Sequence, residues 1–152
     1  MNDLFALKDL GPLHYFLGIQ VHQTATGLHL SPQKYVLDLL RKIRMLSAKG
    51  LPSPMISSAA SQFSAYKGNS FDRATEYRSI VGALQYVTLT RPDIAYAVNK
   101  VCQFMQSPMD EHWKAVKSIL RYLRGTSQLG LNFTRPRLSI IDLALVGFSD
   151  AD

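Results

Sequence analysis

Hydrophobic and polar residues alternate near the start of the chain. Residues 17–21 follow this pattern with a period of two, and residues 28–30 resume it after the turn-forming stretch 24–27. Because successive side chains of a strand point to opposite faces, the alternation predicts a β-hairpin over residues 15–31. Gly18 lies inside the first predicted strand, where a glycine indicates a bulge or the close approach of another backbone.

An amphipathic helix is predicted directly after the hairpin. Ser31 is a favoured N-cap residue, and Pro32 suits the first helical position because no amide hydrogen is needed there. An apolar stripe with helical spacing follows and ends by Lys49-Gly50. Its members are Tyr35, Val36, Leu39, Leu40 and Ile43. Basic side chains flank the stripe, at Lys34, Arg41, Lys42 and Arg44.

The middle of the chain has no periodic pattern. Residues 47–71 are rich in serine, alanine and proline, a composition typical of a solvated linker. We therefore expect a linker that divides the chain into two lobes, with a hairpin and helix over residues 1–46 and a second lobe that begins at residue 72.

Helical spacing dominates the second lobe. One helix is predicted from Glu76 to Leu89, a second from Pro92 onward, and a third from Pro108 to Arg124, with Gly125 as its terminator. Gly82 in the middle of the first of these helices costs about 1 kcal/mol relative to alanine, so we expect it to allow close packing against a neighbouring helix.

Short strands are predicted at the end of the chain, over residues 129–133 and 140–148. The complete pattern indicates an α+β fold that is mostly helical. It consists of the hairpin and helix, the linker, a three-helix bundle over residues 72–126, and the strands of residues 127–152.

Composition limits the class of protein. The 152 residues are 47% hydrophobic and 18% charged, which fits one globular domain and excludes a disordered chain. No run of about 18 uncharged apolar residues predicts a membrane span, and the first residues do not resemble a secretory signal. A single cysteine agrees with a reducing compartment. We expect an intracellular protein that does not contact membranes, whether in the cytoplasm, the nucleus or the mitochondrion.

Basic residues are in excess, and one helix concentrates them. The net charge is +6, from 17 basic and 11 acidic residues, which fits either a polyanionic partner or an ordinary soluble surface. At about 100° per residue, Lys114, Lys117, Arg121 and Arg124 fall within an arc of roughly 80°. This one-sided row, which no acid interrupts, favours contacts with nucleic-acid phosphates over a simple solvated face.

Other reactive residue types do not form a recognisable site. Trp113 is expected to pack rather than to stack on bases, and Cys102 lies among apolar residues as a core side chain would. The four histidines have no nearby thiol or carboxylate that would complete a metal site. Two-metal phosphoryl chemistry needs several converging carboxylates, and Asp150 and Asp152 alone are too few.

Several motifs together resemble the pol polyprotein of copia-type retrotransposons, and they cover nearly the whole chain. They are Phe5-Ala6-Leu7-Lys8-Asp9-Leu10-Gly11, Tyr15-Phe16-Leu17-Gly18-Ile19, Ser31-Pro32-Gln33-Lys34-Tyr35, Tyr77-Arg78-Ser79-Ile80-Val81-Gly82-Ala83-Leu84-Gln85-Tyr86, Thr90-Arg91-Pro92-Asp93-Ile94, Arg121-Tyr122-Leu123-Arg124-Gly125-Thr126 and Gly147-Phe148-Ser149-Asp150-Ala151-Asp152.

The resemblance implies roles in reverse transcription. The hairpin that contains Phe16, Leu17 and Gly18 would correspond to the primer grip, which holds the primer end. Residues 72–126 would form the thumb and connection, and their basic helix would contact the template–primer backbone. Residues 127–152 would lead into a truncated ribonuclease H domain, in which Asp150 would match the first metal-binding carboxylate. The implied partner is an RNA–DNA or DNA template–primer, bound without sequence preference.

The same resemblance implies that this chain has no complete catalytic centre. The family's polymerase carboxylates would lie before Met1, and its remaining ribonuclease H carboxylates would follow Asp152. We therefore expect the chain alone to be inactive and to bind no cofactor, although magnesium is implied for the intact enzyme. Two alternatives stay open: an active polymerase or nuclease part when the missing palm and ribonuclease H segments are joined to it, and a non-catalytic interaction module or pseudogene product.

Overall fold

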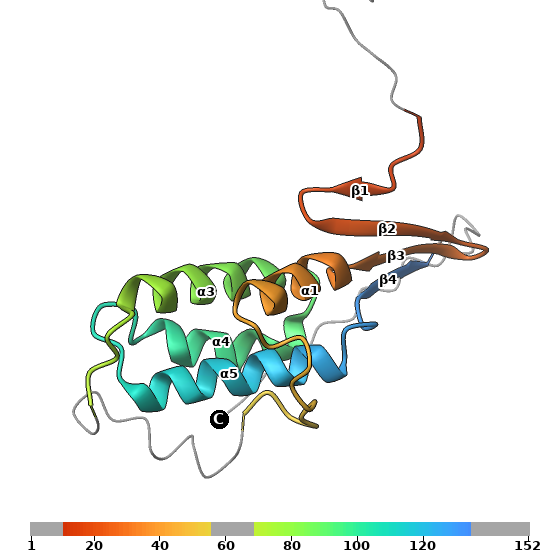
Figure 1. Ribbon diagram of the computed structural model, residues 1–152. Helices are drawn as coiled ribbons and strands as arrows, with labels where there is room; N and C mark the ends of the chain where they lie inside the picture. The colour runs from red at the N-terminus through yellow and green to blue at the C-terminus, as the bar shows by residue number, and fades with distance from the viewer. Residues whose placement is uncertain (1–10, 56–68, 135–152) are drawn as a thin grey trace, which may run out of the picture.

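The computed structural model describes residues 11–55 and 69–134, which form an antiparallel sheet beside a helical body (Figure 1). The strands are β1 (Tyr15–Phe16), β2 (Ile19–Thr24), β3 (Gly27–Ser31) and β4 (Leu131–Thr134). The helices are α1 (Gln33–Lys42), α3 (Ala74–Val87), the 3₁₀ turn η1 (Pro92–Ile94), α4 (Ala95–Cys102) and α5 (Asp110–Gly125). The predicted α+β class, with more helix than strand, is confirmed.

The predicted hairpin is present, with one change in its first strand. β2 and β3 pair antiparallel, from Gln20 opposite Ser31 to Thr24 opposite Gly27. The chain before them turns back at Leu17-Gly18, so that Tyr15 and Phe16 form a separate strand, β1. Gly18 therefore lies in a tight turn rather than in a bulge. Its φ of +83° is a conformation that glycine adopts without strain.

β4 joins the far end of the chain to the hairpin. It pairs antiparallel with β3, from Leu30 opposite Leu131 to Gly27 opposite Thr134, and the sheet has the order β1-β2-β3-β4. The predicted strand over residues 129–133 is thus present, beginning two residues later. The other predicted strand, residues 140–148, lies outside the described residues.

α1 follows the predicted capping pattern closely. The Gln33 amide donates a hydrogen bond to the Ser31 hydroxyl oxygen at 3.2 Å, and the helix begins one residue after Pro32. The apolar stripe faces inward, with Val36, Leu39 and Leu40 all buried. The amphipathic pattern therefore fixes which side of α1 is covered by the rest of the protein.

The remaining helices also agree with the sequence pattern, apart from their ends. α3 stops before Arg91-Pro92, and Pro92 begins a 3₁₀ turn that continues into α4. α5 begins at Asp110, two residues after the predicted start. The Met109 amide, which precedes it, donates a hydrogen bond to Nδ1 of His112 at 3.0 Å.

No helix in the described ranges has the length and apolar character needed to cross a membrane.

One hydrophobic core unites the segments on both sides of the predicted linker. Val36 and Leu40 of α1 belong to the same buried cluster as residues of α3, α4 and α5. The expected division into two lobes therefore does not hold for the core. Both described ends of segment 47–71 are attached to the helical body. The Leu51 amide donates a hydrogen bond to the Arg121 carbonyl oxygen at 3.3 Å. The amide of the buried Phe71 donates a hydrogen bond to the Pro108 carbonyl oxygen at 3.0 Å.

Gly82 does not have its expected role. A Cβ atom built at this position in α3 would have no heavy atom within 4 Å outside its own helix and immediate chain neighbours. The prediction of close helix packing at Gly82 is therefore wrong. The glycine instead leaves the surface of α3 open.

Candidate nucleic-acid interface

The turn between β1 and β2 carries apolar side chains that face solvent. Phe16 is 59% exposed and Leu17 is 68% exposed. The backbone of the turn is nevertheless attached to α3, because the Tyr86 hydroxyl donates a hydrogen bond to the Leu17 carbonyl oxygen. The Tyr35 ring of α1 lies against Gly18, where an added Cβ would be 3.1 Å from Cδ2 of the tyrosine. Two helices thus support a turn whose side chains are free to contact a ligand.

The two supporting tyrosines also contact each other. Their rings meet edge to face, with centroids 5.3 Å apart. Burial, followed by the neighbouring Tyr86, raises the pKa of Tyr35 above its usual value, so the Tyr35 hydroxyl remains neutral at physiological pH. The support beneath the turn therefore combines aromatic packing with a hydrogen bond.

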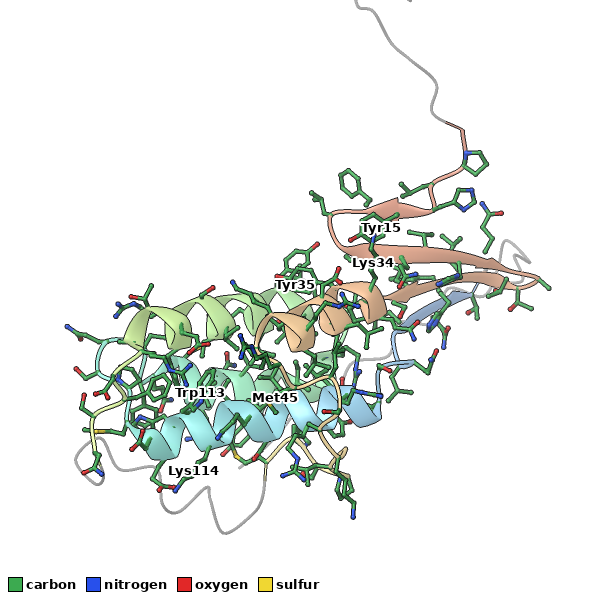
Figure 2. All side chains as sticks on the ribbon, in the orientation of Figure 1. Tyr15, Lys34, Tyr35, Met45, Trp113 and Lys114 are labelled. Carbon is green, nitrogen blue, oxygen red and sulfur yellow. The ribbon has the colours of Figure 1, made fainter. Side chains whose placement is uncertain are left out.

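A basic residue lies directly beside this turn. Nζ of Lys34, at the start of α1, is 4.8 Å from the centroid of the Tyr15 ring. The Lys34 amide donates a hydrogen bond to Oε1 of Gln20 at 3.0 Å, which attaches α1 to β2. Figure 2 shows Tyr15, Lys34 and Tyr35 together where the strands meet the helical body.

A groove of about 560 Å³ follows the boundary between α1 and α3. It is lined by Tyr35, Asp38, Leu39, Lys42, Ser79, Gly82, Ala83 and Tyr86. Nζ of Lys42 reaches across from α1 and donates a hydrogen bond to the Ser79 hydroxyl oxygen of α3 at 3.3 Å. Asp38, the acid of this groove, forms an ion pair with Arg41. The groove therefore extends from the two tyrosines that support the turn, past the open surface at Gly82, to Lys42.

The basic row on α5 is less available than the sequence indicates. Lys114 forms an ion pair with Glu111 at 2.6 Å, one helical turn earlier, so the row is not free of acids as expected. The hydrogen bond to Glu111 raises the pKa of Lys114. Lys117 lines a shallow pocket that also contains Asp110 and Glu111. Nearby carboxylates therefore reduce the positive potential at the start of α5.

The two arginines of the row attach a loop to the helix. Nε of Arg121 donates to the carbonyl oxygen of Lys49 at 2.9 Å, and Nε of Arg124 donates to that of Leu46 at 2.8 Å. Both bonds hold the segment after α1 against α5. These side chains have a structural role, which the spacing of charges along one helix does not reveal.

The structure does not bring the predicted site residues together. Figure 1 shows β1 above the helical body, on the side of α1 and α3, whereas α5 lies on the lower side. Figure 2 shows the corresponding separation between Tyr15 and Lys114. Phe16, Leu17 and Gly18 therefore belong to a different surface from the α5 row. Asp150 lies outside the described residues.

The expectations for Trp113 and Cys102 can be compared with their surroundings. Trp113 is buried and stacks on Phe71 with ring centroids 5.0 Å apart, so its predicted packing role is confirmed. Cys102 packs against the core, and burial raises the pKa of its thiol, which opposes thiolate formation. Within residues 11–55 and 69–134, no group of three or more His, Cys, Asp or Glu side chains could hold a metal ion.

A buried arginine organises the end of α5, and sequence reasoning missed it. Arg91 is 2% exposed, donates from Nε and Nη2 to the Asp93 carboxylate at 2.9 and 2.7 Å, and donates from Nη1 to the Thr126 carbonyl oxygen at 2.8 Å. The Tyr122 hydroxyl donates to the same carboxylate at 2.7 Å. The Arg91 hydrogen bonds are the main reason why the pKa of Asp93 is lowered. This network fixes the direction in which the chain leaves α5 toward β4.

The sequence reasoning also missed the residues of the groove. Gly82 is the one groove residue that the sequence marks as unusual, because glycine destabilises the middle of a helix. The sequence does not show that this glycine leaves an open surface. The sequence places Lys34 and Lys42 on the polar side of α1 without indicating a groove. α1 contains three basic residues and one acidic residue, and α5 contains four and two, so both helices have the same basic excess and charge balance alone does not identify the α1 surface.

Comparison with known proteins shows that the chain is similar to transposon polyproteins. It is 47% identical over its full length to the retrovirus-related Pol polyprotein from transposon RE1 of Arabidopsis thaliana and 39% identical to that from transposon TNT 1-94 of Nicotiana tabacum. It covers only 10% and 12% of those polyproteins.

A shorter relative has a similar sequence identity to this chain. An uncharacterized mitochondrial protein of Arabidopsis thaliana is 46% identical over 131 residues, which make up 86% of this chain and 53% of that protein. No family model matches the sequence, and no solved structure matches it significantly. The similarity, which extends over the full length of this chain, confirms its resemblance to the Pol polyproteins of copia-type retrotransposons.

Proposed function

We propose that the chain is the part of a retrotransposon reverse transcriptase that holds the template–primer. The binding surface would consist of the β1–β2 turn and the α1–α3 groove. One observation carries this proposal: Tyr86 and Tyr35 fix an apolar, exposed turn, and both also line a groove that contains Lys42, while Lys34 lies beside the turn. The relatives named as Pol polyproteins support the same assignment.

The turn is suited to contact the end of a nucleic-acid strand. Phe16 and Leu17 offer apolar surface that can pack on a sugar or a base without selecting a sequence. Because the Leu17 carbonyl oxygen is bonded to Tyr86, the turn does not have to become ordered when it binds. A fixed, apolar turn would hold a strand end in one position.

The groove is suited to a sugar–phosphate backbone. Gly82 has no side chain, and the space above it admits close approach of a strand to α3. Lys34 at one end and Lys42 at the other would neutralise phosphates and release their counterions. Binding that depends mainly on phosphates is weak, independent of sequence and sensitive to salt. Contact of the backbone with Lys114, Lys117, Arg121 and Arg124 stays an untested, competing prediction, because these residues lie on another surface.

Catalysis is not required for this binding function. The magnesium implied for the intact enzyme would be held by carboxylates such as Asp150, whose role stays a prediction, while the described residues would bind and orient the nucleic acid. A palm segment and a ribonuclease H segment are the proposed partners for chemistry. The chain's own residues would position the strand for those partners.

The direct test is binding of a fluorescently labelled RNA–DNA hybrid to the purified full chain, followed by anisotropy at increasing salt concentration. We expect the affinity to be similar for unrelated sequences and to fall linearly in a plot of log K against log salt. The slope should be about −0.9 for each phosphate contacted on duplex DNA. Absence of binding at low salt, or affinity that does not change with salt, would reject the proposed function.

A further inference from the structure

A pair of histidines lies on the polar face of the sheet, apart from the proposed nucleic-acid interface. His22 of β2 and His29 of β3 are directly opposite each other in the strand register. Their ring centroids are 6.2 Å apart, and the ring planes are tilted by 31°. Cross-strand neighbours project from the same side of a sheet, so both imidazoles are available on one surface.

The next strand fixes the orientation of one of these rings. Asn132 of β4 is opposite His29, and Nδ1 of the histidine donates a hydrogen bond to Oδ1 of Asn132 at 2.7 Å. A ring that carries its proton on Nδ1 presents the lone pair of Nε2. Histidines that ligate metals typically have this arrangement, in which an oxygen acceptor holds the N–H of the second ring nitrogen.

The two rings can approach a common ion without a change in the sheet. A metal bound to two imidazole nitrogens lies about 2.0–2.1 Å from each. His22 is exposed, so rotation about its side-chain torsions can bring its Nε2 atom toward that of His29, whose ring Asn132 holds in place. The described residues provide no third histidine, cysteine or carboxylate at this position, and water would complete the coordination shell.

We propose that His22 and His29 form a binding site for a divalent transition metal ion. The ion is Zn²⁺, the two histidines are its protein ligands, and Asn132 orients His29. The bound ion connects β2 to β3 beside β4, and therefore stabilises the sheet that carries the β1–β2 turn. With two protein ligands, the site binds Zn²⁺ reversibly rather than as a permanent structural metal. This role is independent of nucleic-acid binding.

The test uses the full chain without an affinity tag, titrated with Zn²⁺ and followed by NMR signals of the histidine rings. We expect the His22 and His29 signals to move together. His22→Asn should abolish the response, and His14→Asn is the matched control because His14 is exposed but lies outside the pair. Asn132→Ala keeps both ligands and should weaken Zn²⁺ binding about tenfold.

Two further readouts separate metal ligation from a general effect on folding. Zn²⁺ should raise the melting temperature of the wild type but not that of His22→Asn, and it should bind less well at mildly acidic pH, because protonated imidazole offers no lone pair. No movement of the ring signals, or an equal loss of binding in His14→Asn and His22→Asn, would overturn the proposal. Failure of hybrid binding alone would not affect it.

Discussion

The hydroxyl group of Tyr86 donates a hydrogen bond to the main-chain carbonyl oxygen of Leu17, a residue 69 positions earlier in the sequence. This bond links the last turn of α3 to the tip of the β1–β2 turn. It makes the position of the exposed Phe16 and Leu17 side chains depend on the helical body. The proposed interface therefore relies on a contact between two segments that are far apart in the chain.

The first prediction concerns this contact. Tyr86→Phe removes the hydroxyl group and keeps the ring that meets Tyr35, so the turn should lose a hydrogen bond worth about 1 kcal/mol. We expect a severalfold loss of affinity for an RNA–DNA hybrid, measured by anisotropy, and a fall of only a few degrees, about 2–4 °C, in the melting temperature. Tyr122→Phe is the control, because its hydroxyl bonds to Asp93 on another side of the protein. Equal binding by Tyr86→Phe and wild type would contradict the role of the turn.

Gly82 provides a prediction in which stability and binding change in opposite directions. A side chain at this position meets open space, so Gly82→Ala should raise the free energy of unfolding by about 1 kcal/mol through better helix propensity. Gly82→Gln should stabilise α3 to a similar degree but fill the groove, and it should lower hybrid affinity about tenfold, or about 1.4 kcal/mol. Urea unfolding and anisotropy measure the two effects. Binding by Gly82→Gln that matches Gly82→Ala would show that the groove is not used.

The buried Arg91 network predicts a large effect on stability. Arg91→Ala leaves the Asp93 carboxylate and the Thr126 carbonyl oxygen without their guanidinium donor. We expect the free energy of unfolding to fall by about 2 kcal/mol, because the hydrogen bonds of the buried guanidinium are lost while the Asp93 side chain, 37% exposed, can still be solvated by water. Arg91→Lys should recover only part of the loss, since an ammonium group cannot form the paired bonds to the carboxylate. Full stability of Arg91→Ala in urea would contradict the network.

Asp93 predicts how stability changes with pH. Hydrogen bonding to Arg91 lowers the pKa of this carboxyl in the folded protein. Its stabilising contribution is therefore complete above the ordinary aspartate pKa and is lost as the pH falls through the lower pKa of the folded state. In urea titrations from neutral to acidic pH, Asp93→Asn should start less stable than wild type, and the difference should shrink at acidic pH. A constant difference would contradict this contribution.

The sequence could predict those elements that depend on local patterns. The period of two in residues 17–30 and the apolar stripe of α1 identify the hairpin and the helix, because side-chain direction repeats within each element. Gly82 shows the limit of this reasoning: a glycine in a helix is compatible both with close packing and with an open surface. Only the position of the neighbouring helices distinguishes the two.

Roles that depend on distant partners could not be predicted. Arg121 and Arg124 look like phosphate ligands on a helical projection, but their Nε atoms bond to carbonyl oxygens 72 and 78 residues earlier. The pairing of β3 with β4 likewise joins residues about a hundred positions apart, as between His29 and Asn132. Such contacts arise from the common core, whose assembly is not encoded in any single window of sequence.

The most direct test of the account compares two matched pairs of lysines by the salt dependence of RNA–DNA hybrid binding. Lys34→Gln with Lys42→Gln removes the charges beside the turn and groove, whereas Lys114→Gln with Lys117→Gln removes the same charge from α5. We predict that the first variant reduces the steepness of the log K against log salt plot by about 1.8, for two phosphate contacts on duplex DNA. The second variant should retain the wild-type slope. A wild-type slope in the first variant together with a reduced slope in the second would contradict the account and assign nucleic-acid binding to α5.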